Sequence, residues 1–228
     1  MGWSLLSLRV GAPKPFGPRA EPSAIAKQPV ASQYLDYKGF DADQQGDPVH
    51  HGGPQKAVHH YAFEHYAVWR RELSGLDGVQ NLATGGFGEN LSTIGLTEAN
   101  VAIGDTFALG RAVIQVSQPR QPCWKLSVRF NVRGMARKVQ TSGRTGWYYR
   151  VLQPGQVAAT DTLDRIERSN PDWTLQRVLN VLYCDSLNID ELRQLAALPA
   201  LTQRIRDLAV RRLANAAVED WAPRLDGQ

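Results

Sequence analysis

The chain has 228 residues, 43% of them hydrophobic, a size that allows one large domain or one domain with a small appendage. The net charge of +4 permits an anionic ligand, but the arginines are scattered until the last third of the chain, which argues against a nucleic-acid partner. Two distant cysteines exclude a disulfide framework and favour a reducing, cytoplasmic location.

Short strands and turns are predicted for the first 50 residues. Residues 5–10, 23–30 and 34–37 have the composition of strands, and glycine and proline separate them. The first of these runs is too short to span a membrane and lacks the features of a signal peptide. It therefore predicts a strand, and neither a membrane segment nor a targeting sequence is expected.

A helix is predicted for the next segment. Apolar and aromatic residues recur at spacings of three and four from Val58 to Leu73. Pro54 suits the first turn of such a helix and Gly75 suits its end. The glycine-rich stretch at residues 85–93 then indicates a backbone that turns tightly or approaches another segment closely.

The central part of the chain returns to strands. Residues 101–109 and 112–117 read as a hairpin, and residues 124–142 look partly helical. A second hairpin is predicted from residues 147–152 and 162–168. Mixed short strands at this density predict an α+β, mainly β fold, built as a small barrel with helical excursions.

Every element beyond residue 170 looks helical. Three helices are predicted, at residues 175–184, 191–198 and 202–214. The domains are accordingly placed at residues 1–169, the barrel, and 170–228, a small three-helix domain whose tail packs back through Trp221. Because short helices bury little surface alone, they are expected to dock on the barrel or on a second subunit, which leaves a homodimer open.

One cysteine occupies an unusual loop. Cys123 follows Pro122 and lies between Arg120 and Lys125, directly after a predicted strand. Proline stiffens such a loop, and neighbouring cations favour the thiolate, which is both a nucleophile and a soft metal ligand. The alternative is a small apolar residue that closes the end of a barrel. Local sequence alone leaves both interpretations open.

The five histidines lie between positions 50 and 65, but their spacing argues against zinc. No His-Glu-x-x-His motif is present, and His60 and His65 are five residues apart. His65 is predicted to be a hydrogen-bonded core residue. His51 and the glycines after it, with Lys56, could form an anion-binding loop at a helix N-terminus, or a plain helix-entry turn.

Several separated motifs, taken together and in order, resemble the MOSC domain family, and most closely its YiiM-type branch of bacterial hydroxylaminopurine reductases. These motifs are Gly-Asp-Pro-Val-His-His-Gly-Gly-Pro, Glu-His-Tyr-Ala-Val-Trp, Phe-Gly-Glu-Asn-Leu-Ser-Thr, Ile-Gly-Asp-Thr-Phe and Gln-Val-Ser-Gln-Pro-Arg-Gln-Pro-Cys-Trp-Lys-Leu. The resemblance covers nearly the whole chain, including a C-terminal three-helix domain and a Trp-x-x-Arg-Leu tail.

The resemblance implies a MOSC-type β-barrel that binds molybdenum cofactor, with Cys123 as the protein ligand to the metal and Asn90 near it. It also implies positions that line the pterin and phosphate side: His51, Lys56, Arg120 and Lys125. Lys56 stands where many relatives have arginine, which keeps the charge but loses a two-pronged donor. The doubled His50-His51 leaves open which imidazole faces the site, and Cys184 matches no motif and is expected to be structural.

The resulting hypothesis is a molybdenum-cofactor oxidoreductase that reduces N-hydroxylated compounds, with electrons from a separate reductase. One alternative is a cofactor carrier or sulfur-transfer module without turnover of its own. Another is an enzyme with a nucleophilic cysteine paired with a histidine. The arginine-rich last helix would meet an acidic electron donor or, as charged helix faces more often do, simply face solvent. Its arginines are Arg204, Arg206, Arg211 and Arg212.

Overall fold

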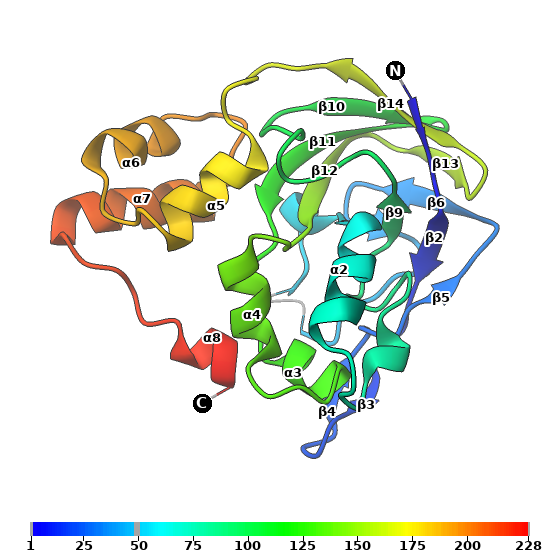
Figure 1. Ribbon diagram of the computed structural model, residues 1–228. Coiled ribbons are helices and arrows are strands. Elements are labelled where there is room, and N and C mark those ends of the chain that lie inside the picture. Colours follow the sequence, from blue (N-terminus) through cyan, green and yellow to red (C-terminus); the bar gives the residue numbers. More distant parts are fainter. Residues whose placement is uncertain (1, 48–50, 228) are drawn as a thin grey trace.

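The computed structural model describes residues 2–47 and 51–227, which form one large mixed sheet with helices packed around it (Figure 1). Its described strands run in the order β1 (Gly2–Ser4), β14 (Thr162–Glu167), β10 (Thr106–Leu109), β11 (Ala112–Pro119), β12 (Trp147–Gln153), β8 (Val58–Ala62), β9 (Leu91–Thr93), β2 (Ser7–Val10) and β5 (Gln28–Pro29). The pair of β8 and β9 is parallel and the other neighbours are antiparallel.

Two smaller sheets complete the β structure of the described residues. One has the order β13 (Gly155–Ala158), β6 (Ser32–Asp36) and β7 (Gly39–Phe40), and the other pairs β3 (Lys14–Phe16) with β4 (Glu21–Ser23). The predicted strand at residues 23–30 is therefore only two short pieces, β4 and β5. The intervening residues leave regular structure, and several of them reach the functional site described below.

The predicted α+β fold is confirmed as a large mixed sheet with a C-terminal helical domain, but no closed barrel appears among the described strand pairs. The N-terminal segment comes closest to closing the sheet into a barrel. β1 pairs with β14, while β2, only two residues further along the chain, pairs with β9 near the other end of the strand order. Leu5 and Leu6 span this step with backbone hydrogen bonds to Asp161 and Ser92.

The helix predicted from Val58 is wrong in its first part. Residues 58–62 form strand β8, and helix α2 covers only Glu64–Glu72. All five residues of β8 are buried, because β12 and β9 flank the strand and both of its faces are covered. A strand buried on both faces shows no alternation of polar and apolar residues, so its apolar spacing resembles one face of a helix.

The hairpin predicted around residue 110 is confirmed, since β10 and β11 pair antiparallel with Phe107 opposite Ile114. The second predicted hairpin is wrong. β12 pairs with β11 and β8, whereas β14 pairs with β10 and β1. The connection between them forms β13, which joins β6 in a separate sheet. These pairings join strands distant in sequence and leave no local signal.

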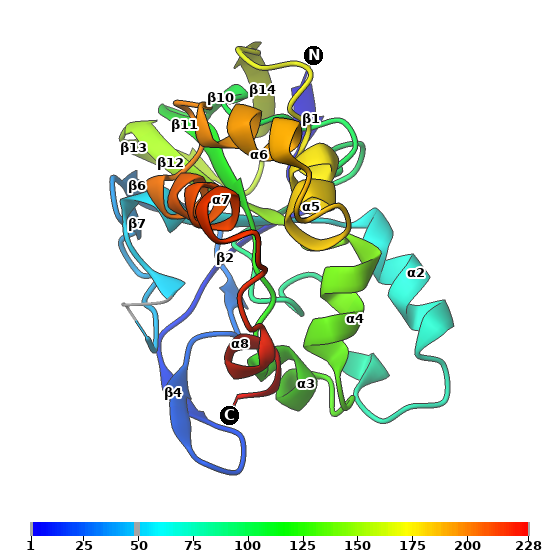
Figure 2. The same cartoon turned by 90° about the vertical axis from the view of Figure 1, so that its left-hand side faces the viewer.

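The helices follow the predicted order closely. They are α3 (Lys125–Arg129), α4 (Met135–Ser142), α5 (Leu175–Tyr183), α6 (Ile189–Ala196), α7 (Gln203–Asn215) and the short tail helix α8 (Ala222–Asp226). Figure 2 shows α5, α6 and α7 gathered beside the sheet. Their apolar side chains, such as Leu182, share one core with strand residues such as Val116. The helices therefore dock on the sheet. The tail packs back through Leu225, which is 1% exposed, and the predicted Trp221 is half-buried with its ring 5.5 Å from that of Tyr183.

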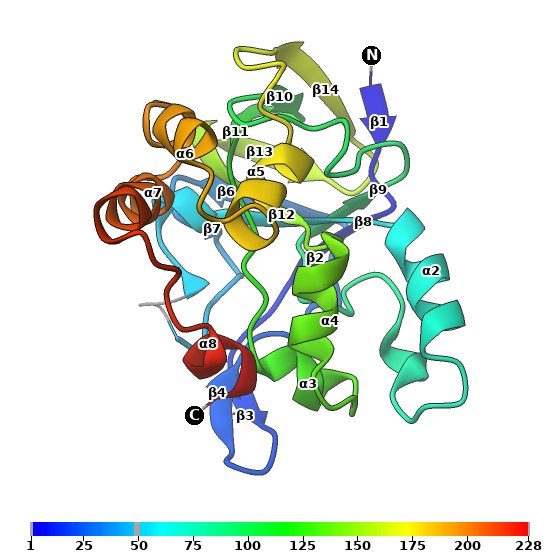
Figure 3. The same cartoon turned by 60° about the vertical axis from the view of Figure 1, so that its left-hand side comes forward.

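A second core supports the loop that carries Cys123. It lies among α2, α3 and α4, which Figure 3 shows on the side of the sheet away from α6 and α7. Phe87 stacks on Tyr61 and contacts Phe130, which caps the C-terminal end of α3. No helix in the described part of the chain is both long and apolar enough to cross a lipid bilayer.

Acid is expected to destabilise the fold through His60. This residue is fully buried between Tyr149 and Thr93, whose hydroxyl groups lie 3.0 Å from its two ring nitrogens. Burial lowers the pKa of His60 to about 3. Between this value and the ordinary histidine pKa of about 6.5, the unfolded chain binds a proton at His60 and the folded chain does not. The stabilisation from neutral His60 is therefore complete above about pH 6.5 and is lost as the pH falls toward 3.

Unfolding in denaturant at a series of pH values measures this effect. We expect His60→Gln to remove up to about 1.4 kcal/mol per pH unit from the slope of the unfolding free energy between pH 6 and 4. His59, whose pKa burial also lowers, would keep part of the slope in the variant. An unchanged slope would show that His60 is not buried in its neutral form.

Candidate active site

The site begins with a row of side chains across neighbouring strands. In β11, β12 and β8, the residues Gln118, Tyr148 and His59 stand opposite one another. The rings of His59 and Tyr148 lie 5.0 Å apart. Asn90 directly precedes β9, the parallel neighbour of β8, and its side-chain oxygen accepts a hydrogen bond from the backbone N–H of His59 at 2.9 Å. Strand register thus gathers residues from four distant parts of the chain.

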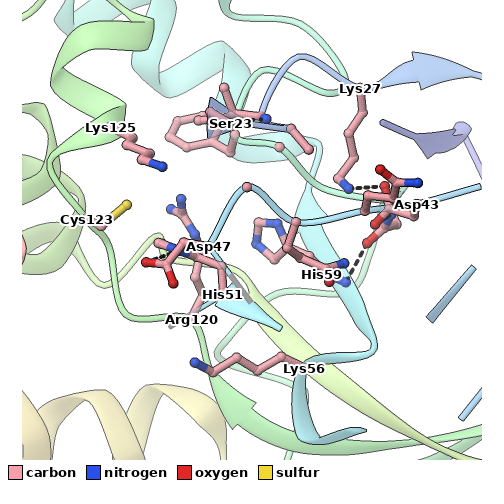
Figure 4. Close-up of a pocket in the computed structure, with 18 of the residues that line it drawn as sticks. Ser23, Lys27, Asp43, Asp47, His51, Lys56, His59, Arg120, Cys123 and Lys125 are labelled. Atoms are coloured by element: carbon pink, nitrogen blue, oxygen red, sulfur yellow. Dashed lines mark hydrogen bonds and ion pairs between the residues drawn. The ribbon is translucent and has the colours of Figure 1, made fainter. Parts of the chain in front are cut away.

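The cysteine loop continues from the end of β11 over this row. Arg120 directly follows the strand, and its backbone N–H donates to the carbonyl of Gly146 at 2.9 Å. Cys123 is a free, half-buried thiol just before α3. Figure 4 shows its sulfur turned toward the middle of a pocket, with Lys27 and Asp43 at the far end. The predicted change from strand to loop at this cysteine is confirmed.

All six residues named from the sequence line this one pocket, whose space of about 640 Å³ is partly open to solvent. They are His51, Lys56, Asn90, Arg120, Cys123 and Lys125. His50, the other candidate imidazole, lies outside the described residues. The pocket therefore brings together a single thiol and several cationic groups from separate segments. This arrangement suits an anionic ligand that carries a metal able to bind a thiolate.

Arg120 gives the clearest indication that the pocket binds a ligand. The residue is 6% exposed, and within the described part of the chain its Nη1 atom is buried without a hydrogen-bond partner. His59 Nε2, in the same pocket, is likewise buried and unpartnered there. Because unpaired buried polar groups are costly, such groups indicate a binding partner that the described residues do not supply.

Two further charged residues were missed by the sequence reasoning. Lys27 and Asp43 form a buried ion pair at the far end of the pocket, with side chains 7% and 4% exposed. Burial lowers the pKa of Lys27, and the attraction of Asp43 opposes that shift. The available signal was a lone lysine in the apolar run Ala-Ile-Ala-Lys, whose partner lies in a loop that only the fold brings near.

Asn90 connects these parts of the pocket. Its amide nitrogen donates to Asp43 and to the carbonyl of Arg9, both at 3.0 Å. Together with the bond from His59, these contacts engage both ends of an amide that is 2% exposed. They describe a residue that holds the pocket wall. Its catalytic role stays a prediction.

Burial and neighbouring cations keep His51 of the pocket neutral. Burial, reinforced by Lys125 and Arg120, lowers the pKa of His51 to about 4, although Asp47 lies 3.7 Å from its Nδ1. Burial also lowers the pKa of Lys56 to about 8. At neutral pH the pocket therefore presents an uncharged imidazole beside a protonated amine that titrates close to the working pH.

The anion site predicted at a helix N-terminus after His51 is wrong in its helical part. Residues Pro54–Lys56 form only a three-residue 3-10 turn, so no helix supplies aligned N–H groups there. Lys125 is 9% exposed, and its ammonium donates to the carbonyl of Pro22 at 3.0 Å. The cations, rather than a helix end, therefore give the pocket its positive character.

The surroundings of the other histidines bear on the zinc site that their spacing argues against. Among the described residues, no three His, Cys, Asp or Glu side chains gather as a metal site. His65 forms the predicted hydrogen bond, at 2.7 Å with Glu98, but its side chain is 12% exposed, so it lies at the edge of the core. Cys184 is exposed after α5, so burial does not support its expected structural role.

The tail helix α8 holds the cysteine loop from outside. The side chain of Arg224 donates to the carbonyl of Pro122 and, at 2.6 Å, to Gln140. Its backbone carbonyl accepts from the N–H of Trp124 at 2.9 Å. The residues before and after Cys123 are thus both bound by Arg224, which fixes the position of the thiol.

We expect Arg224→Ala to loosen this loop. Loss of the charge-assisted hydrogen bonds should lower the free energy of unfolding by about 1.5–3 kcal/mol and increase the alkylation rate of Cys123, measured on its own peptide by mass spectrometry. Arg137→Ala is the matched control, because Arg137 is 54% exposed and pairs with Asp226 of α8, the helix that carries Arg224. Equal alkylation rates in both variants would contradict the positioning role.

Comparison with known proteins identifies the parts of the chain. The MOSC domain model matches residues 47–164, and a YiiM-like, 3-alpha helix domain model matches residues 173–216. YflK of Bacillus subtilis, an uncharacterized protein, is 41% identical over 208 residues, which cover 90% of this chain and 91% of YflK. The boundary predicted at residue 169 stays a prediction.

Two further relatives extend the comparison. YiiM of Escherichia coli is 38% identical over 212 residues, 92% of this chain and 93% of YiiM. Its crystal structure matches with a TM-score of 0.84, covering 99% of this chain and 98% of that chain at 32% identity. A protein of Gibberella moniliformis named "Reductase" is 36% identical over 219 residues, 93% of this chain but only 38% of that protein.

Proposed function

The chain belongs to the MOSC domain family, and from that premise we propose that it is a molybdenum-cofactor-dependent reductase of N-hydroxylated compounds, such as hydroxylaminopurine bases. The observation that carries the proposal is the pocket that Cys123 shares with Arg120, whose Nη1 atom is buried without a partner among the described residues. The fungal relative named "Reductase" supports the reaction class.

The residues present fit the cofactor on chemical grounds. A cysteine thiolate is a soft donor that suits a metal already carrying sulfur ligands, so Cys123 would hold the molybdenum. The cofactor's phosphate needs positive partners, which Arg120 and Lys125 would provide. Asn90, through its bonds to His59 and Asp43, would keep the wall beside the metal in place.

The reaction takes up two electrons and two protons, converts the N-hydroxyl compound to the amine and releases one water. When bound, the cofactor supplies the redox chemistry. The chain would supply orientation and protons. Lys56 is the suitable proton donor, because its pKa of about 8 keeps it protonated at pH 7 yet able to lose the proton. His51, with a pKa of about 4, is neutral and would orient rather than protonate.

The electrons would come from a separate reductase, because the sequence resembles neither a flavin nor a nicotinamide site. A cytoplasmic reductase is consistent with two unpaired cysteines. The protein would thus act as the terminal component of a short electron-transfer chain.

Turnover with an artificial donor tests the proposal. Protein made in a host that synthesises molybdenum cofactor should reduce 6-hydroxylaminopurine with reduced methyl viologen, whereas protein from a cofactor-deficient host should not. Protein that binds the cofactor but reduces no hydroxylamine would be a carrier instead. Activity that is hydrolytic and independent of molybdenum would indicate a cysteine-nucleophile enzyme.

A further inference from the structure

Cys123 also faces a second pocket, which lies between the sheet and the C-terminal helices. Its space, part of which is open to solvent, amounts to about 1000 Å³. Five of its lining residues also line the first pocket: Asp47, His51, Lys56, Cys123 and Tyr148. The wall that it does not share comes from the cysteine loop at Trp124, from α7 at Arg204 and from the tail. Figure 3 shows the chain descending from α7 to α8 along this side of the molecule.

The lining of the second pocket is positively charged. It contains Lys56, Arg204 and Arg224, against a single carboxylate, that of Asp47. Neither Arg204 nor Arg224 forms an ion pair with any residue in the ranges 2–47 and 51–227. Arg204 is also close enough to contribute to the lowered pKa of Lys56, second only to burial. An anion would therefore be favoured at this end.

The four arginines of α7 divide into different roles. Arg212 is 2% exposed and binds Glu219 at 2.8 Å, so it serves the fold. Arg206 donates to Gln203 on its own helix. Arg211 is exposed and lies outside the pocket. Arg204 alone among them lines a cavity that reaches Cys123.

The remaining walls suit a flat ring. Trp124 and Tyr148 are both half-buried and lie on the lining beside Cys123. Aromatic side chains of this kind stack with heteroaromatic rings of any base. A planar ring near the thiol and an anionic group near Arg204 would satisfy both parts of the pocket.

We propose that the second pocket is the substrate site and that Arg204 at its rim selects substrates carrying a phosphate, so that the preferred ligand is a purine nucleotide rather than the free base. The proposal rests on the proposed function for the reaction, but the binding site is defined by Arg204 and the aromatic walls alone. The first pocket would then be left to the cofactor.

Calorimetric titration tests the inference on full-length protein purified from a cofactor-competent host. Adenosine 5′-monophosphate should bind at least about tenfold more tightly than adenine, since a charge-assisted hydrogen bond to the phosphate favours the nucleotide by at least that factor. Arg204→Gln should remove most of that preference. Arg211→Gln, on the same helix but outside the pocket, should keep it.

Equal binding of the two ligands, or a loss in Arg204→Gln that is the same for both, would overturn the inference. Turnover of 6-hydroxylaminopurine and its ribonucleoside 5′-monophosphate with a small-molecule donor then separates the two proposals. If neither compound is reduced while the Arg204-dependent nucleotide binding persists, the proposed reaction fails and the site stands. If both are reduced at equal kcat/KM, the reaction stands and the site fails.

Discussion

Replacement of Cys123 by serine is expected to lower kcat for N-hydroxylated substrates by at least about 100-fold. Changes to groups that merely support a metal ligand typically cost 10–100-fold, and loss of the ligand itself should cost more. The hydroxyl group of serine is a harder donor and stays protonated at neutral pH, so it cannot replace the thiolate. The fold should tolerate the change, because the neighbouring backbone bonds to Arg224 are kept.

The matched control is Cys184→Ser, at the exposed cysteine after α5. This variant should retain wild-type kcat and KM. Far-ultraviolet circular dichroism and thermal unfolding of both variants would confirm that any loss of activity reflects chemistry and not folding. Comparable turnover in Cys123→Ser and the wild type would contradict the assignment of the metal ligand.

Glu89→Ala should have the largest effect on stability. The carboxylate of Glu89 is fully buried, and it accepts hydrogen bonds from Tyr66, Ser92 and the N–H groups of Gly85 and Phe87. Alanine would leave these buried donors without a partner. Removal of a buried charged group from such a network should lower the free energy of unfolding by about 3–5 kcal/mol, measured by denaturant unfolding.

An exposed carboxylate provides the control for this measurement. Glu72 is the last residue of α2. Its side chain is 48% exposed and pairs with Arg144 at 2.7 Å. Glu72→Ala should change the unfolding free energy by less than about 1 kcal/mol, as is usual for surface ion pairs. Similar losses in both variants would show that the Glu89 network does not hold the loop that ends at Asn90.

Local patterns predicted the parts of the fold that depend on local contacts. The helices after residue 170 show clear amphipathic stripes, and α5 begins after Thr174, whose hydroxyl accepts from the N–H of Arg177. The hairpin of β10 and β11 has a short connection and was likewise predictable. β8 was not, because a strand buried on both faces lacks alternation.

Motifs predicted one side of the site better than the other. The residues implied by the family resemblance meet in one pocket because β8, β9, β11 and β12 are neighbours in the sheet. Two other features depend on contacts between segments far apart in sequence. One is the buried ion pair of Lys27 and Asp43, and the other is the pocket that Arg204 and Cys123 line together. No local pattern encodes such contacts, so only the fold reveals them.

The most direct measurement of the central claim is the molybdenum and pterin content of the purified protein. Protein made in a cofactor-competent host should carry molybdenum and pterin in equal amounts, near one of each per chain, and Cys123→Ser should retain little metal. Wild-type protein without molybdenum, or an unchanged metal content in Cys123→Ser, would contradict the account.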